Sequence, residues 1–154
     1  MRVLEGVRAD ALPLEELISD GQPVLLRGVA RDWELVQAGL RPAQDAMPYL
    51  LGFDAGSPIQ YSFGGPGIAG RPFYNEDFTR LNFDVRRGSL AQVLGEISDH
   101  LDDPRPPTYY VASLLVDGAL PGFARANALP LAAQDIDAPP SIWIGNRVVA
   151  SCHF

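Results

Sequence analysis

Hydrophobic and polar residues alternate strictly along residues 58–64. Every second side chain is apolar and those between are polar (Ile59, Tyr61 and Phe63 against Gln60 and Ser62). Successive side chains of a strand point to opposite faces of a sheet. The pattern therefore predicts a strand with one face against a core and one face in water.

Residues 89–101 show the clearest helical period. Their apolar residues recur three and four positions apart (Leu90, Val93, Leu94, Ile97 and Leu101), which places them on one face of a helix. Ser89 and Gln92 have the spacing of a capping box, and Pro104, behind two aspartates, ends the pattern. We predict an amphipathic helix that begins at Ser89.

Two shorter helices are predicted nearer the start of the chain. Residues 14–20 follow Pro13, which suits the first turn of a helix, and precede Gly21; their apolar positions share one face (Leu14, Leu17 and Ile18). Residues 43–51 repeat at helical spacing, with Gly52 placed as a stop (Ala43, Ala46, Met47, Leu50 and Leu51).

Further strands complete the expected elements. Residues 23–27 form a brief apolar run before Gly28 and predict a buried strand. Residues 109–116 are rich in aromatic and β-branched side chains, and residues 142–149 predict a strand interrupted at a glycine and an asparagine. The fold class predicted from these elements is α+β, with helices packed on one side of an antiparallel sheet.

Composition narrows the class of protein. With 47% hydrophobic and 20% charged residues the chain resembles a folded globular domain, and 15 glycines and 14 prolines favour short elements joined by turns. The net charge of −7 excludes a broad basic surface for nucleic acid. All 12 basic residues are arginine, a bias that we interpret as bacterial origin, and Cys152 is the sole cysteine. Neither a signal peptide nor a membrane-length apolar run is present, so we expect a cytoplasmic protein without membrane contact.

The most specific pattern lies in residues 141–154, where a segment with Trp143 and Gly145 leads to His153. This segment resembles the strand that opens the iron site of the JmjC-like cupins, a family of Fe(II)- and 2-oxoglutarate-dependent oxygenases that includes asparaginyl and other protein hydroxylases. The resemblance covers nearly the whole chain and continues upstream through four further regions (residues 109–113, residues 61–83, residues 23–28 and Trp33).

The resemblance implies a metal ligand and a cosubstrate site. The family's strand carries His-x-Asp, whose side chains share one face because they are two residues apart, and a second histidine follows later. His153 is the first iron ligand by this resemblance, and the aspartate would be residue 155. Tyr110 corresponds to a tyrosine near 2-oxoglutarate, where a phenol can donate to a carboxylate; core packing is the alternative for Tyr110. Many relatives place a serine or threonine three residues before the histidine, whereas this chain has Ala150 there and Ser151 beside it.

The resemblance also implies a fold and a domain arrangement. We expect a partial double-stranded β-helix, the cupin jelly roll, with N-terminal helices packed on its outside. Residues 1–154 would form one incomplete domain, with an α+β region at 1–105 and the first strands of the β-helix at 106–154. An incomplete barrel exposes strand edges and apolar faces, which favours self-pairing into a homodimer.

The expected function is the N-terminal part of an Fe(II)- and 2-oxoglutarate-dependent dioxygenase that hydroxylates a protein or peptide, with N-methyl demethylation as a variant and no activity from this portion alone. Two alternatives stay open: a cupin fold that only binds a ligand or another protein, and a short protein whose metal-free half barrel is an interaction surface.

Several other residues have structural explanations. His100 ends the predicted helix of residues 89–101, where the helix dipole favours a partly positive side chain. The glycine-rich residues 64–67 lack the lysine of a phosphate-binding loop and predict a turn. We expect Cys152 to be a small buried residue, and Trp33 and Trp143 to lie in the core or at its rim.

Overall fold

The computed structural model describes residues 1–40, 45–128 and 139–149. They form two compact units, one from the described residues within Met1–Leu50 and Gly122–Ala138 and the other from those within Leu51–Pro121 and Pro139–Phe154. Ser151, Cys152 and His153 lie outside the described residues.

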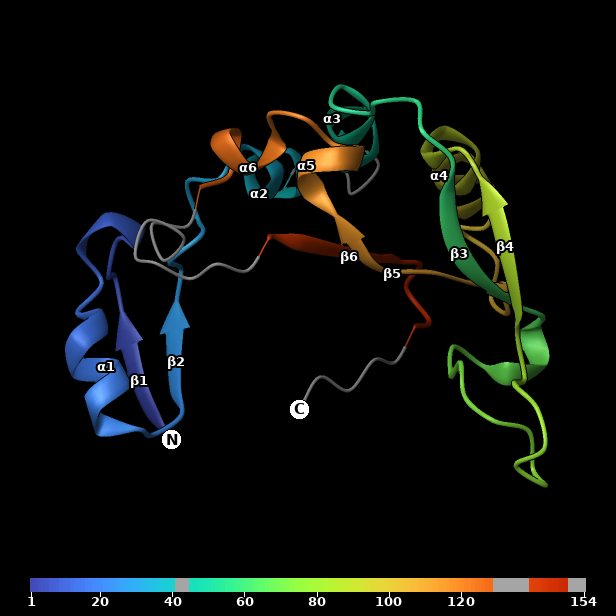
Figure 1. Ribbon diagram of the computed structural model, residues 1–154, viewed down its shortest axis with the longest axis horizontal. Coiled ribbons are helices and arrows are strands. Elements are labelled where there is room, and N and C mark those ends of the chain that lie inside the picture. The colour runs from blue at the N-terminus through green and yellow to red at the C-terminus, as the bar shows by residue number, and fades with distance from the viewer. Residues whose placement is uncertain (41–44, 129–138, 150–154) are drawn as a thin grey trace. The chain divides into compact units, whose positions relative to one another are not determined.

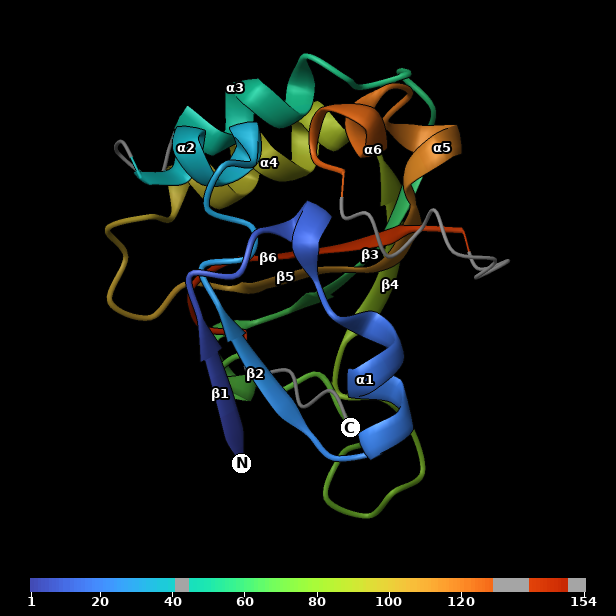
Figure 2. The same ribbon diagram turned by 90° about the vertical axis from the view of Figure 1, so that its left-hand side faces the viewer.

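The first unit begins with a strand, a helix and a second strand. β1 (Arg2–Glu5) pairs in parallel with β2 (Val24–Arg27), and α1 (Leu14–Asp20) connects them. Figure 2 shows α1 beside this pair, where Arg2 contacts Glu16 at 3.0 Å. Gly21 ends α1 in the left-handed conformation, φ +60°, which glycine adopts without strain.

The helix and the second strand predicted for this region are present, but the predicted burial of their side chains is wrong. β2 alternates half-buried and exposed residues, so the expected buried strand is wrong. A two-stranded parallel pair covers little surface, and Leu25 is 38% exposed. Ile18, which shares the predicted apolar face of α1 with Leu14 and Leu17, is 73% exposed.

Three short helices complete the first unit: α2 (Glu34–Leu40), α3 (Ala46–Leu51) and α6 (Phe123–Ala126). A buried side chain, Asn127, joins them. Its amide oxygen accepts from Leu35 N at 3.0 Å, and its amide nitrogen donates to the Tyr49 hydroxyl at 2.9 Å and to Phe123 O at 3.1 Å. The predicted helix at 43–51 is confirmed from Ala46 onward, whereas α2 was not predicted.

The second unit contains a four-stranded sheet in the order β4-β3-β5-β6, with every neighbouring pair antiparallel (Figure 1). The strands are β3 (Ile59–Gly64), β4 (Asp84–Gly88), β5 (Thr108–Leu115) and β6 (Ser141–Gly145). The mixed α+β class and the antiparallel sheet are therefore confirmed, and a closed jelly roll is not shown by the described strands.

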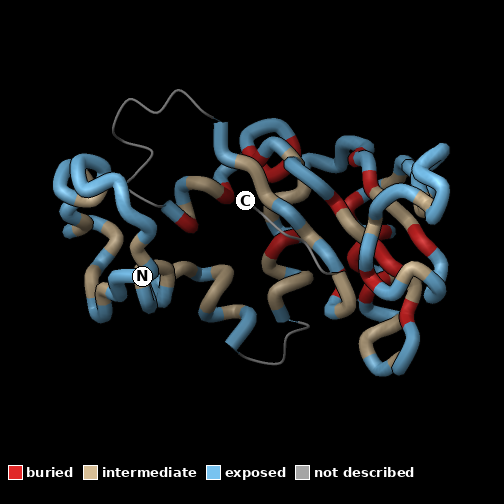
Figure 3. The backbone as a smooth tube through the Cα atoms, turned by 90° about the horizontal axis from the view of Figure 1, so that it is seen from below, coloured by how far each residue is buried: buried red, intermediate tan, exposed pale blue. Residues whose placement is uncertain are grey.

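One face of this sheet is covered by α4 (Leu90–Asp99). Figure 3 shows the buried residues concentrated in this unit, and only Leu50 and Phe123 of the buried hydrophobic set belong to the other. The helix and the sheet each contribute four large apolar side chains to this core (Leu90, Val93, Leu94 and Ile97; Ile59, Tyr61, Tyr109 and Val111). The Ser89 hydroxyl accepts from Gln92 N at 3.0 Å, which confirms the predicted start of the helix.

The remaining segments of the second unit are short. Val116 begins α5 (Val116–Ala119) instead of ending the strand before it. The glycine-rich turn contains a 3-10 helix, η3 (Pro66–Ile68), and another, η1 (Ala9–Ala11), lies in the first unit. The register of β5 with β6 shifts between Val111 and Leu114.

Candidate functional site

The second face of the four-stranded sheet carries Tyr110. Tyr109 and Val111 are buried on the face that α4 covers, so the side chain between them points to the opposite face. There Tyr110 pairs with Ser62 on one side and with Gly145 on the other. This side of the sheet is the open face.

The open face is partly apolar and accessible. Val85 lies opposite Ser62 and is 53% exposed, and Trp143, two residues before Gly145, is 45% exposed. Tyr110 itself is half-buried. Trp143 thus lies on the open face, so the expectation that it belongs to the core is wrong. A phenol on an open sheet face can donate a hydrogen bond to a bound carboxylate.

The chain turns back toward this face after β6. A Cβ atom at Gly145 would point to the same side as Tyr110, and it would meet the Val149 side chain at 3.0 Å. Val149 N also donates to Asn146 O at 3.0 Å, which closes the turn. Residues 146–149 therefore leave the sheet beside Gly145, on the Tyr110 side.

A buried asparagine fixes the start of that turn. Asn146 is 8% exposed, and its amide nitrogen donates to Pro107 O at 2.6 Å. Its amide oxygen accepts from Tyr109 N at 3.4 Å. Arg147 continues the attachment by donating to Asp103 O. These bonds tie the end of β6 to the segment that enters β5.

Gly70 lies directly against the same turn. Its φ is +75°, and a Cβ atom there would be 1.6 Å from Val148 O. Gly70 N donates to the buried Thr108 hydroxyl at 3.2 Å. Only glycine fits this close backbone approach, a requirement that periodicity in the sequence does not reveal.

His100 lies on the other side of the sheet. Its ring stacks on Tyr109 at 6.3 Å between centroids, and its Nδ1 lies 3.3 Å from Asp103 Oδ2. Since Tyr109 faces α4, His100 is not on the Tyr110 side. These contacts agree with the structural interpretation of His100.

The Tyr109 hydroxyl has an altered acidity. Burial raises the pKa of Tyr109 first, and the nearby Glu96 carboxylate raises this pKa further. The group belongs to the interface between α4 and the sheet, so we assign it to packing and not to the open face.

An iron triad requires two histidines and a carboxylate. Among the residues that the structure describes, no group of three or more His, Cys, Asp or Glu could hold a metal ion. His153, the predicted first ligand, lies outside these residues.

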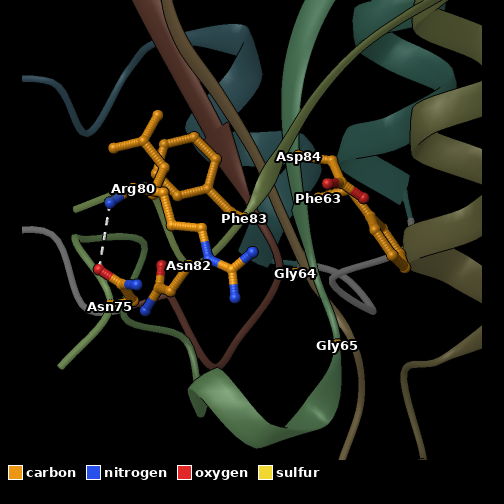
Figure 4. Close-up of a pocket in the computed structure, with 9 residues that line it drawn as sticks. Phe63, Gly64, Gly65, Asn75, Arg80, Asn82, Phe83 and Asp84 are labelled. Carbon is orange, nitrogen blue, oxygen red and sulfur yellow. Dashed lines mark hydrogen bonds between the residues drawn. The ribbon is translucent and has the colours of Figure 1, made fainter. Parts of the chain in front are cut away.

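A separate hollow, which sequence reasoning missed, lies where β3 and β4 diverge (Figure 4). Its volume is about 390 Å³. It is lined by two glycines, two asparagines, an arginine and two phenylalanines, among others (Gly64, Gly65, Asn75, Asn82, Arg80, Phe63 and Phe83). The Phe83 ring lies beside Arg80, whereas the Phe63 ring points to the other side of β3 and packs against Tyr109. Only a structure brings these residues together, because they come from both ends of a long loop.

Comparison with known families identifies the class of protein. The model of the cupin-like domain family matches residues 9–154. The chain therefore belongs to the cupin-like domain family, a JmjC-like group that includes 2-oxoglutarate oxygenases. No curated protein matches the chain. Within its described residues, no helix is long and apolar enough to span a membrane.

Proposed function

We propose that this chain provides the first strands of an Fe(II)- and 2-oxoglutarate-dependent oxygenase that hydroxylates a protein or peptide. Iron(II) and 2-oxoglutarate are the cofactor and cosubstrate that such chemistry requires. Tyr110 donates a hydrogen bond to a carboxylate of the cosubstrate, His153 is the first metal ligand, and Ser151 is a further cosubstrate contact.

The observation that carries the proposal is that Tyr110 and the end of β6 lie together on the open face of the sheet. Tyr110 and Gly145 are direct partners across β5 and β6, and Val149 lies against Gly145. The family match over residues 9–154 contains both the tyrosine and the segment that follows. Tyr110 and the described residues that follow β6 therefore lie on one side of the sheet, which supports the connection that resemblance suggested.

Two features of the chain suit this role. Gly145, the partner of Tyr110 on β6, has no side chain, and the Val149 side chain lies against the position where a Cβ atom would be. Gly70 and Asn146 restrict the backbone just before the predicted ligand segment. A site that is held by rigid neighbours loses less entropy when it binds its ligands.

The test is turnover of 2-oxoglutarate by the protein as its gene encodes it. With iron(II), oxygen and 2-oxoglutarate, succinate should be released, and omission of iron should stop it. Binding of 2-oxoglutarate in calorimetry without succinate release would favour the non-catalytic binding module instead. Absence of both binding and turnover would contradict the proposal.

A further inference from the structure

The loop that joins β3 to β4 is held in one conformation by Asn75. Its amide oxygen accepts from Thr79 N at 3.0 Å and from Arg80 N at 3.2 Å. Its backbone N donates to Arg80 O at 2.8 Å. Both backbone polar groups of Arg80 are thus bonded to the same residue, which fixes the point from which the arginine side chain extends.

Asn82 fixes the other side of this loop in the same way. Its amide oxygen accepts from Phe73 N at 2.8 Å, and its amide nitrogen donates to Arg71 O at 3.0 Å. An isolated bridge between Tyr74 and Leu81 lies between the two asparagines. The loop is therefore a built structure with its own hydrogen bonds.

The tip of the loop contains a strained residue. Phe78 has φ +57°, a conformation that a bulky side chain rarely adopts, and it is 69% exposed. Asp77 supports this turn by accepting from the Thr79 hydroxyl at 2.7 Å, and this contact lowers the pKa of the Asp77 carboxyl. Strain of this kind persists where neighbours over-determine the conformation, and it is concentrated at functional sites.

Arg80 extends from this loop into the hollow. Figure 4 shows its guanidinium between the loop and the end of β3 at Gly64 and Gly65. Gly65 leaves the space next to it open, since a Cβ atom there would meet nothing within 4 Å. A volume of about 390 Å³ falls within the range of small-ligand pockets, roughly 300–1,000 Å³.

The acidic residues around the hollow do not pair with Arg80, so its guanidinium is available to a ligand. Asp84 lines the same hollow, but its carboxylate pairs with Arg86 at 3.4 Å. The Arg86 guanidinium also lies 3.5 Å from the centre of the Phe63 ring. Within the described part of the chain, no acid forms an ion pair with Arg80. The hollow therefore offers a guanidinium without an acidic partner next to the aromatic ring of Phe83.

We propose that this hollow binds a carboxylate group that carries an apolar substituent, either a small organic acid or an acidic side chain in a peptide. The guanidinium of Arg80 presents two parallel N–H donors to the two carboxylate oxygens. The ring of Phe83, which lies beside Arg80 in Figure 4, provides the apolar wall, and the asparagine bonds hold the backbone of the arginine in advance of binding. The assignment goes beyond the proposed oxygenase function, because it needs neither iron nor 2-oxoglutarate.

The test uses two pairs of probes that differ only in charge. The small pair is phenylacetate and phenylacetamide, and the peptide pair is the blocked dipeptide phenylalanyl-aspartate and its asparagine analogue. Each is titrated into isotopically labelled protein, and the backbone amide signals of Gly64 and Gly65 are followed by nuclear magnetic resonance. At least one acid should give saturable shifts that its neutral partner does not give, and the tighter acid identifies the source of the carboxylate.

Three variants distinguish binding in the hollow from general electrostatic attraction to the protein surface. Arg80→Gln should weaken binding by about tenfold or more, the effect expected for loss of a hydrogen bond to a charged group. Gly65→Leu should also weaken binding, because the leucine side chain would fill the hollow. The backbone accepts this substitution, since Gly65 has an ordinary extended conformation, φ −63° and ψ 169°. Arg87→Gln, which removes an exposed arginine that does not line the hollow, should leave binding unchanged. The same spectra show whether each variant is folded.

Two results would overturn the proposal. One is the absence of saturable shifts with either acid at millimolar concentration in the folded wild type. The other is binding that Arg80→Gln and Arg87→Gln weaken equally, because this would indicate attraction to surface charge. Both readouts are independent of turnover, so they leave the oxygenase proposal untouched.

Discussion

Gly70 passes so close to Val148 that a Cβ atom at residue 70 would lie 1.6 Å from the Val148 carbonyl oxygen. The two residues are far apart in sequence, and they bring the loop after β3 against the turn after β6. That turn precedes the predicted metal ligand. The contact therefore links a backbone requirement for glycine to the position of the candidate site.

Replacing Gly70 by alanine should destabilise the protein. The left-handed backbone alone costs an L-residue about 1–2 kcal/mol, and the contact with Val148 O forces the backbone to move as well. Urea unfolding should show a lower midpoint for Gly70→Ala. Gly67→Ala is the matched control, because a Cβ atom there would meet nothing within 4 Å. Equal midpoints for the two variants would contradict this contact.

Asn146→Ala should be destabilising for a different reason. The substitution leaves Pro107 O and Tyr109 N without their side-chain partner in a buried position, which costs about 1–3 kcal/mol when no water replaces the amide. Gln60→Ala removes an exposed amide from β3 and should change the free energy of unfolding little. Chemical denaturation of both variants measures the difference. A loss at Gln60 as large as that at Asn146 would exclude a special role for the buried amide.

Sequence patterns predicted the elements whose residues show a clear period. Ser89 and Gln92 located the start of α4, and the alternation around Tyr61 located β3. β4 was missed because Asp84, Arg86 and Arg87 give it no apolar alternation, although pairing with β3 makes it a strand.

Burial was harder to predict than the elements themselves. β2 has the composition of a buried strand, yet only β1 pairs with it. A short apolar run does not specify how much surface will cover it.

The residues of the candidate site were likewise predicted only in part from the sequence. Tyr110 was identified by resemblance, and the strand period together with the packing of α4 places it on the open face. Arg80 carried no sequence signal, because its role in the hollow depends on how Asn75 folds the loop. His153 and Ser151 stay predictions, since they lie outside the described residues.

Tyr110→Phe should raise the 2-oxoglutarate concentration needed for half-maximal turnover. Loss of one hydrogen bond to a charged carboxylate is worth roughly 1.5–3 kcal/mol, or about 10- to 150-fold. Tyr109→Phe changes the neighbouring residue on the opposite face, so it should alter stability without this shift. Succinate release over a 2-oxoglutarate series distinguishes them. If the shift followed Tyr109 and spared Tyr110, the assignment of the open face would be wrong.

The central claim is tested most directly by succinate release from the protein as its gene encodes it, compared with its His153→Ala variant at saturating iron(II) and 2-oxoglutarate. Two remaining ligands cannot hold iron in the open geometry of a facial triad. The account predicts iron-dependent turnover in the wild type and loss of turnover in the folded variant. Full activity of His153→Ala would contradict the metal assignment and, with it, the proposal that this chain provides the first strands of an oxygenase.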